Sequence, residues 1–171
     1  MAFPLNPSKA RLFCAVFYSD KSLYNDALII LKQNFGAVET ESDEYNFSDF
    51  TDYYKEEMGE GIFKKIIIFK NPIERTDLPD IKIITNEIEL ELSEGNKREI
   101  NIDPGYFTLN QAVLASCKEM PHRIYLDKGV YADLMYAFSN TDVFTTRHTF
   151  PDYQDKIVKD FFLKERNKLK K

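Results

Sequence analysis

The sequence predicts an α+β protein: a ferredoxin-like βαββαβ core, extended by a C-terminal antiparallel hairpin or meander and a terminal helix, as a two-layer sandwich. Two nearly unbroken apolar runs of strand length, residues 11–19 and 62–70, predict interior strands. Each run precedes apolar residues at helical spacing, which begin at a capping residue and end at a glycine. Because no repeat or linker divides the chain, residues 1–171 are expected to form a single domain.

The first part of the chain supplies the elements of the core. An irregular lead-in, residues 1–10, contains two prolines. The core elements then follow in order: strand 11–19, a helix that begins after Ser19 or Asp20 and ends at Gly36, strand 37–47, strand 62–70, a helix from Thr76 or Asp77 to Gly95, and strand 98–103.

The second part is expected to begin where Pro104-Gly105 breaks the chain. Thr108 with Gln111 resembles a capping box and predicts a short helix to about Ser116. The remaining elements are a hairpin over 122–136, a turn over 139–142, a strand over 143–149, an amphipathic terminal helix, and a basic tail over 163–171.

The hairpin is the most informative stretch. A three-residue loop ending at Gly129 would pair Ile124 with Ala132, and Leu126 with Val130. Alternation predicts a core face and a polar-aromatic face. The core face would contain His122, Ile124, Leu126, Val130, Ala132 and Leu134, and the other face Arg123, Tyr125, Tyr131, Asp133 and Met135.

Composition restricts the class of protein. A net charge of −5 makes nucleic-acid binding an unlikely main role, because that affinity depends largely on neutralised phosphates. Cys14 and Cys117 show no metal spacing and are expected to be buried, reduced thiols. The early apolar run is too short to span a bilayer, so no membrane association and a cytoplasmic location are expected. The oligomeric state stays open.

Catalytic candidates follow from the hairpins. If the turn after the hairpin has two residues, Asp133 lies between Arg123 and His148, and a carboxylate that orients a histidine is a common acid–base arrangement. The alternative is a structural ion pair beside a surface histidine. Asp103 is a third catalytic candidate before a predicted helix N-terminus, although it equally suits a turn.

The connection over 50–59 supplies the remaining candidates. If it is helical, Asp52 and Glu56 stand one turn apart and could bind a divalent metal such as magnesium. The alternative is that these acids interact with the helix dipole. Tyr53 and Tyr54 in the same stretch are candidate ligand-binding residues. Phosphate loops, GxGxxG, GxSxG and HExxH motifs are absent from the sequence.

Several short sequence motifs, taken together, resemble those of the bacterial domain-of-unknown-function family 4416, over residues 11–162. They are Phe50-Thr51-Asp52-Tyr53-Tyr54, Glu56-Glu57-Met58-Gly59, Thr85-Asn86-Glu87, Asn101-Ile102-Asp103-Pro104-Gly105-Tyr106, His122-Arg123-Ile124-Tyr125-Leu126, Gly129-Val130-Tyr131-Ala132 and Phe150-Pro151-Asp152-Tyr153. Family members usually have Glu at the position of Asp133 and Tyr at that of Phe150. The resemblance implies no established activity, and a GTP-binding label is not carried over because the chain lacks the phosphate-loop and NKxD motifs.

These observations lead to one main hypothesis and two alternatives. The main hypothesis is a pocket for a small anionic, phosphate-bearing or carboxylate ligand, with enzymatic and metal-assisted chemistry left open. Its ligand-binding residues would be Arg123, Tyr125, Tyr131, Tyr53 and Tyr54. The first alternative is a non-catalytic protein-interaction module, and the weaker one is RNA binding through tyrosines on the sheet.

Overall fold

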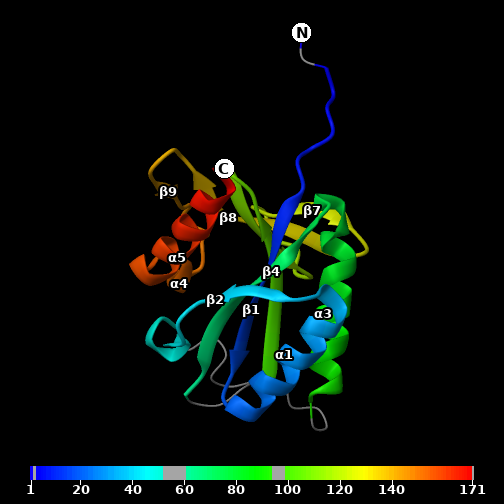
Figure 1. Ribbon diagram of the computed structural model, residues 1–171, viewed down its shortest axis with the longest axis vertical. Coiled ribbons are helices and arrows are strands. Elements are labelled where there is room, and N and C mark those ends of the chain that lie inside the picture. The colour runs from blue at the N-terminus through cyan, green and yellow to red at the C-terminus, as the bar shows by residue number, and fades with distance from the viewer. Residues whose placement is uncertain (2, 52–60, 94–98, 171) are drawn as a thin grey trace.

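The computed structural model describes residues 1, 3–51, 61–93 and 99–170. Among these residues, nine strands form one antiparallel sheet that packs against four α-helices (Figure 1). The strands are β1 (Ala10–Tyr18), β2 (Val38–Glu41), β3 (Tyr45–Asn46), β4 (Phe63–Ile73), β5 (Ile100–Phe107), β6 (Gln111–Ser116), β7 (Ile124–Asp127), β8 (Val130–Phe138) and β9 (Val143–Phe144). The helices are α1 (Lys21–Phe35), α3 (Leu78–Glu91), α4 (Pro151–Gln154) and α5 (Lys156–Asn167). The predicted mixture of helix and sheet is confirmed.

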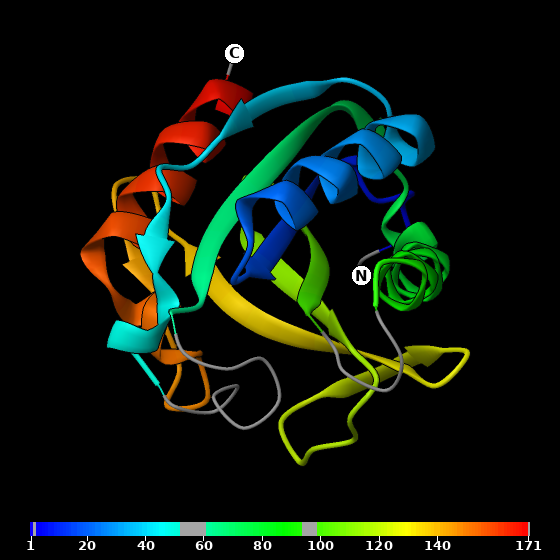
Figure 2. The ribbon, with the colours of Figure 1, turned by 90° about the horizontal axis from the view of Figure 1, so that it is seen from below.

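Strand β1 lies in the middle of the sheet, whose order is β2-β4-β1-β5-β6-β8-β7. Leu12, Cys14 and Val16 of this strand pack in one cluster with residues of α1 and α3. The alternate residues Phe13, Ala15 and Phe17 pack in another cluster, with Val158 and Phe162 of α5. Helices therefore cover both faces of the sheet (Figure 2), and the two-layer prediction is wrong because α5 covers the second face.

The two long predicted helices are present. Helix α1 begins after Asp20, whose Oδ1 accepts a hydrogen bond from the Ser22 N–H at 2.8 Å. It ends at Gly36, which has a φ of 88° and donates its N–H to the Lys32 carbonyl. Helix α3 begins at Leu78 with Pro79 in its first turn and ends at Glu91, before the predicted Gly95.

The predicted break at Pro104-Gly105 is wrong, because β5 continues through both residues to Phe107. A Cβ on Gly105 would lie 2.4 Å from the Val113 carbonyl oxygen and 2.5 Å from a Phe13 ring carbon. Gly105 is therefore needed for close approach of β5 and β6, and it does not interrupt the strand.

The predicted helix over 108–116 is also wrong, since residues 111–116 form strand β6. The Thr108 Oγ1 accepts hydrogen bonds from the N–H groups of Asn110 and Gln111, and the Thr108 N–H donates to the Gln111 carbonyl. The pattern that resembled a helix cap therefore forms the turn between β5 and β6, because a threonine hydroxyl satisfies nearby N–H groups in either structure.

The hairpin of β7 and β8 forms as predicted, with Ile124 opposite Ala132 and Tyr125 opposite Tyr131. Its loop has two residues, Lys128 (φ 53°) and Gly129 (φ 76°), and a register shift places Asp127 opposite Val130, where Leu126 was predicted.

The predicted faces of this hairpin are only partly correct. Val130 is buried as predicted and Ala132 packs against the same cluster, but Ile124, Leu126 and Leu134 are exposed, whereas Asp133 and Met135 are buried. A bulge opposite Ala112 and Val113 places Met135 and Tyr136 together in the core, and β7 is an edge strand whose residues are all exposed. Both faces of β8 therefore contribute buried residues.

Two predicted strands are shorter than expected. Residues 37–47 form β2 and the separate two-residue β3. Of residues 143–149 only Val143 and Phe144 form a strand, although the Ser139 N–H donates to the Asp142 carbonyl as the predicted turn requires. The basic tail continues α5 to Asn167 and ends in a 3₁₀ turn over Lys168–Lys170.

Candidate functional site

The candidate site lies where the sheet divides between β5 and β6. These strands pair only over residues 105–107 and 112–114. Towards its N-terminus β5 remains paired with β1, whereas β6 continues to Ser116 paired with β8. The two strands therefore diverge, and over residues 100–104 one edge of β5 pairs with no strand of the described residues.

Side chains of α3 take the place of the missing strand at this edge. Glu89 Oε1 accepts the N–H of Ile102 at 2.7 Å, and Lys82 Nζ donates to the carbonyl of the same residue at 3.1 Å. Because β-strand residues alternate in direction, Pro104, which has no N–H, faces the same edge two residues later. The edge of β5 is thus covered without a further strand.

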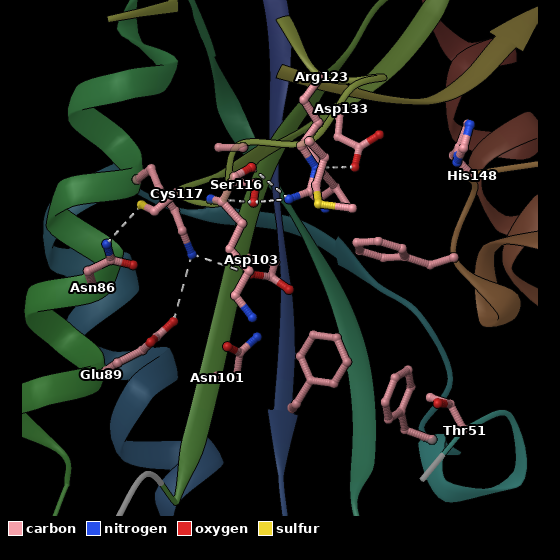
Figure 3. A pocket seen from close by; sticks show the side chains of 18 of the residues that line it. Thr51, Asn86, Glu89, Asn101, Asp103, Ser116, Cys117, Arg123, Asp133 and His148 are labelled. Atoms are coloured by element: carbon pink, nitrogen blue, oxygen red, sulfur yellow. Dashed lines mark hydrogen bonds and ion pairs between the residues drawn. The ribbon is translucent and has the colours of Figure 1, made fainter. Parts of the chain in front are cut away.

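The divergence creates a cleft of about 850 Å³ (Figure 3). Its apolar wall consists mainly of phenylalanine, leucine and methionine side chains, and its polar groups come from α3, β5, the end of β6 and the hairpin. The lining residues are Phe17, Phe47, Thr51, Lys82, Asn86, Glu89, Leu90, Ser93, Asn101, Asp103, Leu114, Ala115, Ser116, Cys117, Lys118, Met120, His122, Arg123, Asp133, His148, Phe150 and Pro151. A concave, mostly apolar space with a few convergent polar groups is typical of small-molecule sites.

Arg123 is fixed in the wall of this cleft. Its Nε donates to Asp133 Oδ2 at 2.8 Å, and its Nη1 donates to the Ser116 hydroxyl at 2.7 Å and to the Lys118 carbonyl at 2.9 Å (Figure 3). The side chains of Arg123 and Asp133 are 8% and 3% exposed. Among the described residues nothing binds Nη2, so its two N–H groups are available to a ligand.

Lys82 and Asp103 form a second polar group across the cleft. Lys82 Nζ lies 3.3 Å from Asp103 Oδ1 and 3.9 Å from Glu89 Oε1. Asp103 is on β5 and Lys82 is on α3, and both line the cleft (Figure 3). Asp103 therefore contributes a partly exposed carboxylate that is held by a lysine.

The two histidines of the chain meet at the rim of the cleft. Their rings stack with centroids 4.1 Å apart and an interplanar angle of 3°. His122 Nε2 is 3.6 Å from Asp133 Oδ2, so His122, and not the predicted His148, is the nearer imidazole to that carboxylate. Desolvation, followed by the proximity of His122 and Arg147, lowers the pKa of His148.

A buried ion pair lies behind the aromatic wall. Lys64 Nζ donates to Asp152 Oδ2 at 2.5 Å, and the Tyr45 hydroxyl donates to the same oxygen at 2.7 Å. The ammonium group is 4.2 Å from the centre of the Phe17 ring, which lines the cleft. Burial, and then the Asp152 charge, raise the pKa of Tyr45 and of Tyr153.

The structure brings together only part of the predicted site. Arg123, Asp133, Asp103 and His148 all line the cleft. Tyr125 and Tyr131 do not; they contact each other edge to face on the projecting hairpin, with ring centroids 5.4 Å apart. The predicted metal ligands Asp52 and Glu56, and the predicted ligand-binding residues Tyr53 and Tyr54, lie outside the described residues. The described residues contain no group of three or more His, Cys, Asp or Glu side chains that could hold a metal ion.

Two predictions about single residues are wrong. His122 was expected in the core, but it lines the cleft, because it lies in the connection before β7, where the alternation of a strand does not apply. Cys117 was expected to be buried, but it is exposed and accepts a weak hydrogen bond from Asn86 Nδ2 at 3.5 Å. Cys14 is buried as predicted, and burial raises the pKa of its thiol.

Lys82 and Glu89 are the main residues that sequence reasoning missed. They follow Ile81 and Ile88 directly, seven residues apart, within the buried stripe of α3. Asp80 and Glu87 directly precede the same two isoleucines and are exposed, so the helical pattern alone does not distinguish the buried pair. Their burial could be recognised only once the position of β5 was known, because each binds a backbone group of Ile102.

The fold and the cleft together define an α+β protein with an antiparallel sheet and a polar cleft where that sheet divides. The chain belongs to the family described as "Domain of unknown function (DUF4416)", whose model matches residues 8–169. Neither the curated proteins nor the solved structures contain a significant match to this chain. In the described part of the chain, no helix has the length and apolar character needed to cross a membrane.

Proposed function

We propose that this protein binds a small molecule with an anionic group, a carboxylate or a phosphate, in the cleft between β5 and β6. The observation that carries the proposal is the state of Arg123: three hydrogen bonds fix its guanidinium group in the wall of a deep cleft. A fixed guanidinium group with an unused pair of N–H groups is suited to an oxyanion, because little side-chain entropy is lost on binding. The apolar wall would bury the rest of the ligand.

The charges around the cleft limit the class of anion. Among the described residues, its lining contains the cations Lys82, Lys118 and Arg123 and, opposed to them, three carboxylates. Because the formal charges of these described residues balance, the cleft suits a ligand with one or two negative charges better than a polyphosphate. If the site is catalytic, Asp103 and Asp133 are the carboxylates that could accept a proton from such a ligand.

Cys117 provides a direct test without a known ligand. It is exposed in the cleft, whereas Cys14, the other cysteine of the chain, is buried and will not compete for reagent. We would measure alkylation of the Cys117 peptide by mass spectrometry, with iodoacetate and with neutral iodoacetamide, and compare the rate ratio at this residue with its ratio in the urea-unfolded chain. The ratio cancels differences in thiol ionisation and accessibility.

We expect the negatively charged reagent to be favoured several-fold in the folded protein and Arg123→Gln to remove most of that preference. Lys128→Gln is the matched control, because Lys128 is an exposed cation at the hairpin tip outside the cleft. Equal ratios in the folded and unfolded chains would overturn the proposal. Sugar phosphates, nucleoside monophosphates and dicarboxylates then serve as a panel for protection of Cys117 and for thermal stabilisation, which reaches about 2.7 kcal/mol at a hundredfold excess over Kd.

The ferredoxin-like core is a finer part of the same proposal. The strand order β2-β4-β1-β5, with every neighbouring pair antiparallel, supports a βαββαβ unit. Both α1 and α3 contribute to one cluster on the same face, as such a unit requires. In this interpretation the cleft lies at the junction between the unit and the added strands β6, β8 and β7.

Protein–protein interaction is a second candidate, favoured by exposed apolar side chains on the hairpin and on β9. Ile124, Leu134 and Phe144 are 71%, 40% and 58% exposed. Light scattering at increasing protein concentration, with Ile124→Lys for comparison, tests self-association through this surface. RNA binding through an open sheet face gains no support, because residues of α5 pack on that face.

A further inference from the structure

We propose that the stacked rings of His122 and His148 form a pH-sensitive clasp, closed while the rings are stacked, which joins the two sides of the rim of the cleft and opens when His148 takes up a proton. The clasp depends on the proposed function only in that the cleft it borders is the binding site. It joins two segments that are distant in the sequence, the β6–β7 connection and the residues between β9 and α4. Both histidines line the cleft.

The second segment is attached to the rest of the protein at two points, by a hydrogen bond from Thr149 at one end and by the stacked ring of His148 at the other. Thr149 Oγ1 donates to the Met135 carbonyl at 3.2 Å and fixes the inner end of the segment on β8. The His148 N–H and the Thr149 N–H donate within the segment, to Thr146. In the described part of the chain, the stacking contact is what connects His148 to the opposite side of the cleft.

His148 is held in its neutral form by this arrangement. Arg147 Nε donates to His148 Nε2 at 3.0 Å, so that nitrogen is an acceptor and has no proton. Protonation at Nε2 would remove the acceptor and place a positive charge next to a guanidinium group. The positive charge would also lie beside the His122 ring, because the centroids of the two rings are only 4.1 Å apart.

The charges around the rings do not offset the cost of a proton on His148. The one carboxylate that the described residues place there, Asp133, has its Oδ2 3.6 Å from Nε2 of His122. The same oxygen already accepts the Arg123 Nε–H at 2.8 Å, so its charge is largely compensated. Asp133 from β8, Arg123 from the start of the hairpin and Arg147 from the segment itself are the charged groups of the described residues around the rings.

The direction of the pH effect follows from the closed state. Desolvation and the proximity of His122 and Arg147 lower the pKa of His148 when the rings are stacked. The closed state therefore binds a proton more weakly than the open state, whose histidine has an ordinary pKa of about 6.5. Closure is fully stabilised above that value and is lost as the pH falls below it.

Hydrogen exchange of the ligand-free protein at pH 7.5 and 5.5, corrected for the intrinsic rate, tests this inference. We expect residues 145–150 of the natural protein to exchange faster at pH 5.5, by up to about tenfold in total, because pH 5.5 lies about one unit below the open-state pKa of about 6.5. His148→Phe keeps an aromatic ring that cannot be charged. In this variant the protection of residues 145–150 against exchange should be the same at both pH values. His148→Gln loses both ring and charge and should exchange rapidly at both.

An unchanged exchange rate in the natural protein, or an equal pH dependence in His148→Phe, would overturn the clasp. An NMR titration of the His148 C2–H signal gives an independent check, because closure lowers the pKa of this imidazole below its ordinary value of about 6.5. A midpoint at or above that value would also contradict the clasp. Failure of these tests leaves the Cys117 test of the anion site unaffected, and failure of that test leaves the clasp intact.

Discussion

Lys64 and Lys82 are both buried lysines that bind carboxylates distant in the sequence, but their surroundings differ. Lys64 is fully buried on β4 and lies against the rings of Phe17 and Tyr153, with Asp152 as its partner. Lys82, on α3, is 6% exposed and faces the cleft, with Asp103 and a backbone carbonyl as its partners. One ion pair is closed off by aromatic rings, and the other opens towards a space of ligand size.

The difference separates an ion pair that secures the fold from one that a ligand can reach. The Lys64–Asp152 pair connects β4 to α4, and residues just before α4 supply Phe150 and His148 to the cleft. The Lys82 group keeps the edge of β5 covered where β6 diverges. Perturbing the first should therefore change global stability most, and perturbing the second should act mainly at the cleft.

The largest effect is expected from Lys64→Met. The substitution leaves Asp152 buried with only the Tyr45 hydroxyl as a described partner, and an uncompensated buried charge costs about 3–5 kcal/mol. Urea unfolding at pH 7 measures this loss. Lys64→Met combined with Asp152→Asn removes both charges and should recover part of it. A loss below about 1 kcal/mol in the single variant would show that the pair does not secure the fold.

A smaller and more local effect is expected from Glu89→Leu. Ile102 then loses the acceptor of its N–H, at a cost of about 1–3 kcal/mol for an unsatisfied buried donor. Glu89→Gln keeps an oxygen acceptor and should cost less. Urea unfolding and the NMR exchange rate of the Ile102 amide are the measurements. Equal losses in both variants, with the amide still protected, would contradict the covering of the β5 edge by α3.

The smallest effect is expected at Glu41, a partly exposed carboxylate on β2. Burial acts to raise its pKa, but hydrogen bonds from Lys65 Nζ (2.6 Å) and the Tyr24 hydroxyl (2.7 Å) lower it overall. Its ion pair therefore stabilises the fold above the unfolded pKa of about 4.3 and is lost as the pH falls through the folded value. Glu41→Gln should cost less than about 1 kcal/mol at pH 7.

At acidic pH the difference in unfolding free energy between the natural protein and Glu41→Gln should disappear, because a protonated glutamate and a glutamine are both neutral. Urea unfolding of the natural protein and of Glu41→Gln at pH 7 and pH 3 makes the comparison. A difference that persists unchanged at pH 3 would mean that the charge of Glu41 contributes nothing to stability.

Sequence reasoning succeeded where local chemistry decides the structure. The apolar run of β1, the Asp20 cap and the Gly36 end of α1 depend on neighbours within a few residues, and all three are present. It failed where one local pattern suits two structures: the Thr108 hydroxyl satisfies N–H groups in a helix cap and in a hairpin turn alike. It failed again on β8, where Val130 and Asp133 are both buried although they point to opposite faces, because both faces of this strand are covered.

The candidate site was predicted in part for the same reasons. Arg123 and Asp133 were placed together because they lie on neighbouring strands of one hairpin. Tyr125 and Tyr131 were wrongly added to the cleft because alternation alone cannot tell where a strand leaves the body of the protein. The His122–His148 stack joins two loops whose relative position no local pattern specifies.

The sequence by itself determined the central apolar strands, the helices that cover them and the pairing of Arg123 with Asp133, since these depend on periodicity and on contacts between neighbouring elements. Tertiary structure alone decided that β5 and β6 diverge and that α3 covers the free edge with Lys82 and Glu89. The physical reason is that a backbone N–H or C=O must find a partner somewhere, and whether a strand or a side chain supplies it depends on how the whole chain packs.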